Sequence, residues 1–268
     1  MNKKLFLAAC CAGSLLFTAC GGNGTSTAPF TVKNYSDSVA NKVQNVDCEV
    51  QISIDYPETG NEALLNGVRE WILDQTSCAP TTDINSGDSI VKGYVDAQMK
   101  DMKEIATELA EFGSAQGCSN SIEIKKTSEN DKFVTFSSTS YNYMGGAHGS
   151  QFEYGTTFRK SDGKVFGYNM LNLAKKEKIA KLIEKALADD LGFETVDELK
   201  KVLFLPEFAE TVPLPQSSPY LDKDTMVFVY QQYEIASYAT GIPTARIPLS
   251  ELKPYLSASF AKTYYAGK

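Results

Sequence analysis

The segment 141–154 constrains the fold most, because three glycines and the chain's only histidine separate two strand-like runs there. Glycine accepts positive φ angles and allows another part of the backbone to approach closely. On either side, residues 133–143 and 152–158 carry the aromatic and alternating patterns typical of strands. The sequence therefore predicts two strands joined by a sharp connection that displays His148. The glycines of this connection are Gly145, Gly146 and Gly149.

Regular patterns predict most of the other elements. Residues 46–54 alternate between apolar and polar side chains, which indicates a strand with one buried face. Apolar residues recur at helical spacing in three segments, 61–76, 88–113 and 175–191. Further strands are expected in a hairpin over 122–143 and at 165–168, 226–231 and 245–249, followed by a last helix from Ser250.

These elements predict an α+β fold, with an antiparallel, strongly twisted sheet and helices packed on one face. Residues 1–19 are predicted to be a lipoprotein signal peptide, and residues 20–44 a flexible tether. An N-terminal strand–helix–helix part is expected over 45–125 and a C-terminal α+β part over 126–268. We expect the last two parts to share one core.

The N-terminus has the pattern of an export signal. Lys3 and Lys4 precede a short apolar run that ends at Cys20. About 15 apolar residues are fewer than the roughly 20 that a membrane-spanning helix needs. The sequence Phe17-Thr18-Ala19-Cys20 is similar to a lipobox, so lipidation of Cys20 is predicted; simple cleavage after a small residue is the alternative. The expected location is the bacterial cell envelope, with the lipid as the only membrane attachment.

The charge of the chain excludes one class of partner. The formal net charge is −7, and removal of residues 1–19 takes away two lysines and no acids. Nucleic-acid binding needs a basic face, which argues against that function. An acidic surface is compatible with a basic protein partner, although it also keeps an exported protein soluble.

Six cysteines are present, of which two lie within the signal peptide. If Cys20 carries lipid, an odd number remains. A bridge between Cys78 and Cys118 is predicted, whereas Cys48 lies on the apolar face of a predicted strand and is expected to be a buried hydrophobic residue. No cysteine and histidine spacing typical of a metal site occurs, so no metal or cofactor is expected.

His148 admits a structural, a binding and a catalytic role, in that order of preference. Its imidazole can hold the connection through local backbone bonds, contact a partner, or act in catalysis. A Ser-His-Asp triad would have to include it, yet no Gly-x-Ser-x-Gly motif supplies the serine. The paired carboxylates Glu153 and Glu234 offer an alternative chemistry, acid–base hydrolysis of a glycan, although acids at strand ends are usually solvated.

Aromatic residues gather around the predicted loops and offer contact surfaces that are apolar in body and polar at the tip. About half of them are expected to be buried. The set comprises Tyr141, Tyr143, Phe152, Tyr154, Tyr230, Tyr233 and Tyr238.

Two motifs resemble a family of secreted domains of unknown function. Tyr143-Met-Gly-Gly-Ala-His148-Gly is similar to the family's central motif, and Tyr233 to Gly241 followed by Ile247-Pro248-Leu249 is similar to its C-terminal end. Ser237 stands where the family usually has proline. Members include the extracellular half of the lysozyme-sensing anti-sigma factor RsiV and the non-catalytic part of certain peptidoglycan deacetylases. The resemblance implies an envelope setting and a surface that binds a lysozyme-like protein or peptidoglycan.

The function expected from the sequence is a non-enzymatic binding module of the cell envelope, with no catalytic residue assigned. An enzyme that acts on cell-wall glycan and a subunit of a larger envelope complex are the alternatives. The candidate binding residues are Tyr143, Gly145, Gly146, His148, Tyr154, Tyr233, Glu234 and Tyr238.

Overall fold

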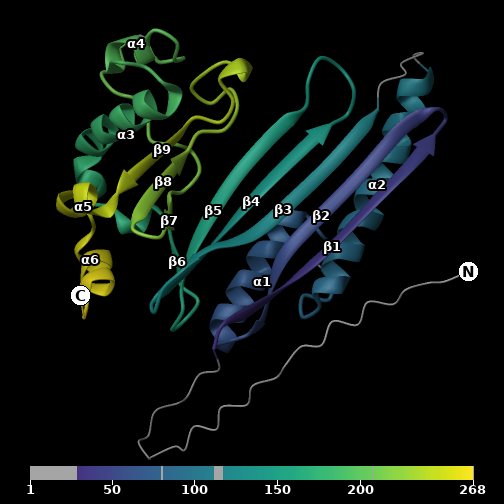
Figure 1. Cartoon of the computed structure of the whole chain (residues 1–268), viewed down its shortest axis with the longest axis horizontal. Helices are drawn as coiled ribbons and strands as arrows, with labels where there is room; N and C mark the ends of the chain where they lie inside the picture. Colours follow the sequence, from purple (N-terminus) through teal and green to yellow (C-terminus); the bar gives the residue numbers. More distant parts are fainter. Residues whose placement is uncertain (1–28, 80, 112–116, 207, 268) are drawn as a thin grey trace, which may run out of the picture.

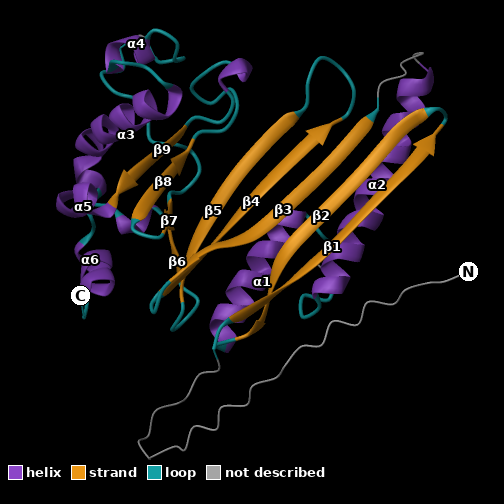
Figure 2. Cartoon of the chain, viewed as in Figure 1, coloured by secondary structure: helices purple, strands orange, loops and turns teal. Residues whose placement is uncertain are grey.

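The computed structural model describes residues 29–79, 81–111, 117–206 and 208–267, and it has the α+β fold that the sequence predicts. A six-stranded sheet of order β1-β2-β3-β4-β5-β6 lies beside a three-stranded sheet of order β7-β8-β9 (Figures 1 and 2). The signal peptide and Cys20 lie outside the described residues.

The strands are β1 (Thr31–Val43), β2 (Val46–Thr59), β3 (Cys118–Glu129), β4 (Phe133–Tyr143), β5 (Ser150–Arg159), β6 (Val165–Phe166), β7 (Tyr220–Asp222), β8 (Thr225–Val229) and β9 (Thr244–Pro248). The α-helices are α1 (Glu62–Thr76), α2 (Gly87–Glu111), α3 (Lys176–Leu191), α4 (Val196–Lys200), α5 (Leu249–Leu252) and α6 (Ala258–Tyr265). Short 3₁₀ turns are η1 (Tyr168–Met170), η2 (Leu173–Lys175), η3 (Tyr238–Thr240) and η4 (Lys253–Tyr255).

The predicted tether is wrong over most of its described length, because residues 31–43 form the edge strand β1. β1 pairs antiparallel with β2 through a two-residue turn at Gln44 and Asn45, both of which have positive φ. Positive φ at both turn residues suits the twist of a tight hairpin. The strand has few apolar residues and is mostly exposed, so the sequence carried only a weak alternation signal.

One pair of strands departs from the predicted antiparallel arrangement. β2 and β3 are parallel, since the chain crosses from one to the other through α1 and α2. The predicted boundary between residues 125 and 126 falls inside β3, which belongs to the same sheet as β2 and β4. The two predicted parts are therefore joined by one continuous sheet.

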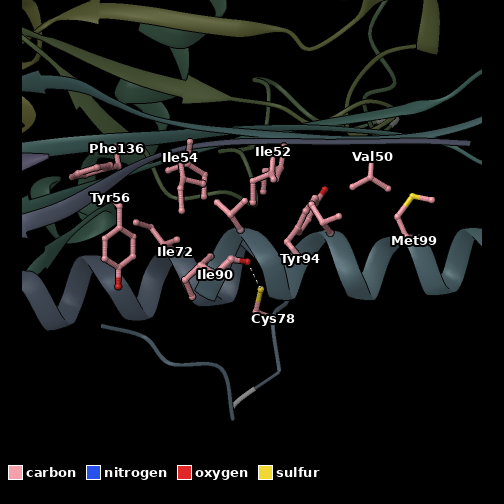
Figure 3. Close-up of a cluster of buried hydrophobic side chains, with 14 of the residues drawn as sticks. Val50, Ile52, Ile54, Tyr56, Ile72, Cys78, Ile90, Tyr94, Met99 and Phe136 are labelled. Atoms are coloured by element: carbon pink, nitrogen blue, oxygen red, sulfur yellow. Dashed lines mark hydrogen bonds between the residues drawn. The ribbon is translucent and has the colours of Figure 1, made fainter. Parts of the chain in front are cut away.

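The first core lies between this sheet and the two helices α1 and α2. Alternate residues of β2 point toward α2, where side chains of the helix interdigitate with them (Figure 3). Trp71 is partly buried and packs against this core, at ring-centroid distances of 6.3 Å from both Phe136 and Phe158. The residues shown in this core include Val50, Ile52, Ile54, Tyr56, Ile72, Ile90, Tyr94, Met99 and Phe136.

The first core contains residues of both predicted parts, such as Ile72 and Phe136, and a second core adds to it. The second core packs α3, α5 and α6 against the three-stranded sheet and one end of the six-stranded sheet. Phe133 belongs to this second core and the next residue, Val134, to the first. Successive strand residues point to opposite faces, so β4 separates the two cores.

The edge of β5 joins the two sheets. β6 pairs with β5 only at Thr157 and Phe158. Further along β5, the Glu153 N–H donates to Gln231 Oε1 at 3.1 Å, and Gln231 Nε2 donates to the Glu153 carbonyl at 2.7 Å. The Gln151 N–H donates to Gln232 Oε1 at 2.9 Å. Side-chain amides thus take the place of a neighbouring strand.

The predicted Cys78–Cys118 bridge is wrong. Cys118 lies directly opposite Cys48 in the β2–β3 register, with 2.7 Å between the two Sγ atoms. The Cys78 thiol instead faces the Ile90 carbonyl, 3.5 Å away, under α2 (Figure 3). Cys48 is buried, as the sequence predicted. All three cysteines are buried, and burial raises the pKa of Cys118 to about 12.

We expect Cys48 and Cys118 to form a disulfide in protein matured in an oxidising compartment, because neighbouring strands hold paired positions within bridging distance. Peptide mapping without reduction should find Cys48 linked to Cys118 and Cys78 free. In reduced, folded protein the Cys118 thiol should resist alkylation at pH 8, since its raised pKa keeps it protonated and the thiolate is the reactive form. A Cys78-containing bridge would contradict this pairing.

Substitution Gln231→Leu should destabilise the protein by about 1–3 kcal/mol. It leaves the backbone N–H and carbonyl of Glu153, at the edge of β5, without the side-chain amide that binds them. The matched control is Gln232→Leu, which removes one hydrogen bond from this edge and should cost less. Urea unfolding measures both losses. Equal stability of the two variants would show that the Gln231 amide does not join the sheets.

Candidate functional site

The connection between β4 and β5 is shaped by its glycines, as the sequence predicts. Gly145 and Gly146 have φ angles of +84° and +96°. The Tyr143 hydroxyl donates to the Gly146 carbonyl at 3.0 Å and closes the connection. Gly149 serves a different purpose, because a Cβ atom there would lie 2.4 Å from the Tyr141 ring.

His148 is exposed and lies against two tyrosines from a distant part of the chain. Its ring stacks on Tyr238, with 3.8 Å between centroids and 19° between planes. Its Nδ1 lies 3.0 Å from the Gly149 carbonyl, and its Nε2 lies 3.2 Å from the Tyr233 hydroxyl. A carbonyl can only accept, so the neutral ring donates from Nδ1 and accepts the Tyr233 hydroxyl at Nε2. We call His148, Tyr233 and Tyr238 the aromatic cluster.

The bend at 231–238 is held by a carboxylate. Glu234 accepts the Gln231 N–H at 2.9 Å and the Gln216 N–H at 2.7 Å. Tyr233 has a φ of +66°, unusual for a residue with a side chain, and 56% of it is exposed. Glu234 therefore fixes the backbone that turns Tyr233 outward toward His148.

Glu153 and Glu234, the two carboxylates considered for acid–base catalysis, are hydrogen-bonded to groups that stabilise the fold. Glu234 binds two backbone N–H groups, as described above, and Glu153 accepts the Tyr220 hydroxyl at 3.3 Å. Burial, with the nearby Glu153 carboxylate as the second cause, raises the pKa of Tyr220, so this hydroxyl stays protonated and able to donate. Both carboxylates stabilise the junction between the sheets.

The predicted aromatic residues are more exposed than expected. Of the seven, Tyr230 alone is buried, and its hydroxyl donates to the Pro213 carbonyl at 2.7 Å. Tyr154 is exposed but pairs with Ser138, on the face of the sheet that carries α1 and α2. It therefore points away from Glu153 and does not belong with the aromatic cluster.

The structure also reveals a groove of about 760 Å³ on the opposite face of the six-stranded sheet. It is lined by residues of five strands, β1 to β5, and most of these residues are of polar type. The groove was not predicted from the sequence, because residues 31–43 were expected to belong to a tether and not to a strand. The only signal was the polar half of the alternation in β2, which includes Gln51 and Ser53.

Within the described ranges, no group of three or more histidine, cysteine, aspartate or glutamate residues is arranged to hold a metal ion. None of the helices found there is long and apolar enough to cross a membrane.

Two family models match successive parts of the chain. Residues 37–151 match the model described as Deacetylase PdaC, and residues 166–250 match the model described as Protein of unknown function (DUF3298). No curated protein matches. The first segment runs from the middle of β1 to the start of β5 and includes the glycine connection, whereas the second contains Tyr233 and Tyr238.

Two crystal structures of the DUF3298 family share the fold. The protein from Bacteroides fragilis is 18% identical, with a TM-score of 0.70, over 87% of this chain and 95% of that one. The protein from Pseudomonas aeruginosa is also 18% identical, with a TM-score of 0.59, over 87% of this chain and 97% of that one. This chain therefore joins a PdaC-like segment to a DUF3298-like segment on the fold of DUF3298 family proteins.

Proposed function

We propose that this protein is an exported, lipid-anchored module of the bacterial cell envelope that binds a basic, lysozyme-like protein without catalysing a reaction. The aromatic cluster carries the proposal. His148 and Tyr233 are 85 residues apart in the sequence, yet their segments meet and form one exposed surface. Tyr233 is largely exposed on this surface, and tyrosine is enriched among residues that dominate binding energy.

The nature of the partner is inferred from charge and from resemblance. The chain is acidic, with a formal net charge of −7, which favours association with a basic protein. The glycine connection and the bend resemble motifs of RsiV, which senses lysozyme. The PdaC and DUF3298 matches are consistent with this resemblance, because they cover the same two motifs.

An enzyme that uses Glu153, His148 or Glu234 fits the geometry less well. A glycosidase needs two carboxylates directed at one bond, one of them free to hold or release a proton. Here Glu234 is bound by backbone N–H groups and Glu153 by Tyr220. His148 is stacked on a tyrosine and bonded at both ring nitrogens.

Titration of the chain from residue 21 with a C-type lysozyme tests the proposal. We expect a Kd of about 1 μM or tighter that persists at moderate salt, where interactions between exposed charges are screened. Tyr233→Ala and Tyr238→Ala should each weaken binding about tenfold or more, a loss of ~1.4 kcal/mol. The control Phe208→Ala removes a ring that is 90% exposed but lies outside the aromatic cluster, and should leave the Kd unchanged.

Two results would refute this function. Binding that disappears at moderate salt would be general attraction between an acidic and a basic protein. Binding that survives at moderate salt but ignores both tyrosine variants would place the contact elsewhere on the molecule. Circular dichroism of each variant confirms that the fold is intact.

A further inference from the structure

The groove on the open face of the six-stranded sheet is built from registered positions on five strands. Helices α1 and α2 lie behind this sheet (Figure 2). The polar residues that line the groove alternate along β2 with those that face the helices, so they lie on the side that the helices leave uncovered. In the hydrogen-bonded register, Ser38 lies opposite Gln51, Gln51 opposite Ser121, Ser121 opposite Tyr141, and Tyr141 opposite Gln151. These five side chains form one row across the sheet.

A second row runs parallel to the first. It consists of Ser36, Ser53, Glu123, Thr139 and Glu153, each opposite the next in the same register. Adjacent strands are about 4.8 Å apart, so four intervals give a polar track roughly 19 Å long that crosses the strands. A track of this shape suits an extended, linear ligand.

The chemistry of the track favours a ligand with many hydroxyl groups. The side chains that line the groove are mostly serine, threonine, glutamine and tyrosine, which both donate and accept hydrogen bonds. Sugar hydroxyls have the same dual character. The core of a protein–protein interface is usually apolar. Among the side chains that line this groove, only Ile52, Ile122 and the ring of Tyr141 offer a large apolar surface.

The charges near the track disfavour anionic polymers. Neither lysine nor arginine is among its lining residues, which include Asp37 and Glu123. Lys125 lies nearby and pairs with Glu123 at 2.7 Å, so these two charges offset each other. A phosphate- or carboxylate-rich chain would therefore find no lysine or arginine among the lining residues to balance its charge. An uncharged chain meets no such penalty.

Tyr141 gives the track a surface on which a sugar ring can stack. Its ring is 37% exposed and lies against Gly149, where a Cβ atom would overlap it. Stacking of a sugar's C–H face on an aromatic ring combines apolar contact with hydrogen bonds at the rim. The Tyr141 ring packs directly on the backbone of Gly149, and this contact holds the ring in place within the groove.

We propose that the groove binds a linear, uncharged glycan laid across strands β1 to β5, with one sugar stacked on Tyr141. This inference goes beyond the protein partner proposed above and concerns a different surface. The first row ends at Gln151, whose N–H is bonded to the side chain of Gln232, next to Tyr233. A glycan in the groove would thus extend toward the aromatic cluster without depending on it.

Calorimetric titration of the chain from residue 21 with two neutral hexasaccharides, chitohexaose and cellohexaose, tests this inference. We expect measurable binding of at least one, and a tenfold or greater loss of affinity in both Tyr141→Ala and Ser121→Leu. Tyr154→Ala is the matched control. That residue is also 37% exposed and lies on the same sheet, but on the opposite face, so its loss should change the affinity less than twofold.

Three outcomes would overturn the inference: no binding of either hexasaccharide, equal effects of Tyr141→Ala and Tyr154→Ala, or a preference for the anionic polymer polygalacturonate. Ser121→Leu guards against an indirect effect through Gly149, because Ser121 lies in the middle of the track and not beside the connection. Lysozyme binding by the unaltered chain is measured separately, so that failure of one proposal is distinguishable from failure of the other.

Discussion

The unpaired edge of β5 is the constraint on which the arrangement of the site depends. Buried or partly buried backbone groups must find hydrogen-bond partners, and an open strand edge invites association with other chains. This chain satisfies part of the edge with the side chains of Gln231 and Gln232 in place of another strand. Because these residues directly precede Tyr233, pairing the edge also brings the 231–238 bend to the end of β5.

Two further interactions convert this proximity into a defined surface. Glu234 accepts two backbone N–H groups and holds the bend, with Tyr233 at positive φ. At the other side, the glycines of the 144–149 connection allow His148 to lie flat on Tyr238. The histidine is therefore positioned by tertiary contacts from both segments, which explains why neither motif alone defines the aromatic cluster.

The sequence predicted those parts of the fold that have a strong periodic signal. The alternation in β2 and the apolar stripes of α1, α2 and α3 appear in the structure close to their expected bounds. β1 escaped prediction because an edge strand with few apolar residues has little periodicity. The parallel pairing of β2 with β3, and hence the meeting of Cys48 with Cys118, depends on long-range register that local patterns do not contain.

Local sequence patterns also predicted only part of the site. The glycine connection and the bend were found from their residues, but the stacking of His148 on Tyr238 and the structural role of Glu234 required the tertiary structure. The groove depends on five strands in register, one of which was not expected. Its polar residues look like ordinary solvent-exposed positions until the strands are aligned.

Proton NMR of His148 tests the central claim most directly, because the chain has one histidine and thus one pair of imidazole ring signals to follow. If the connection and the bend meet as described, the Tyr238 ring shifts these signals upfield. Replacement Tyr238→Leu should return them toward the positions of a solvated histidine, and Gln231→Leu, which loosens the bend, should shift them part of the way. Imidazole signals at solvated positions in the unaltered protein would contradict the account, since the two motifs would then not form one surface.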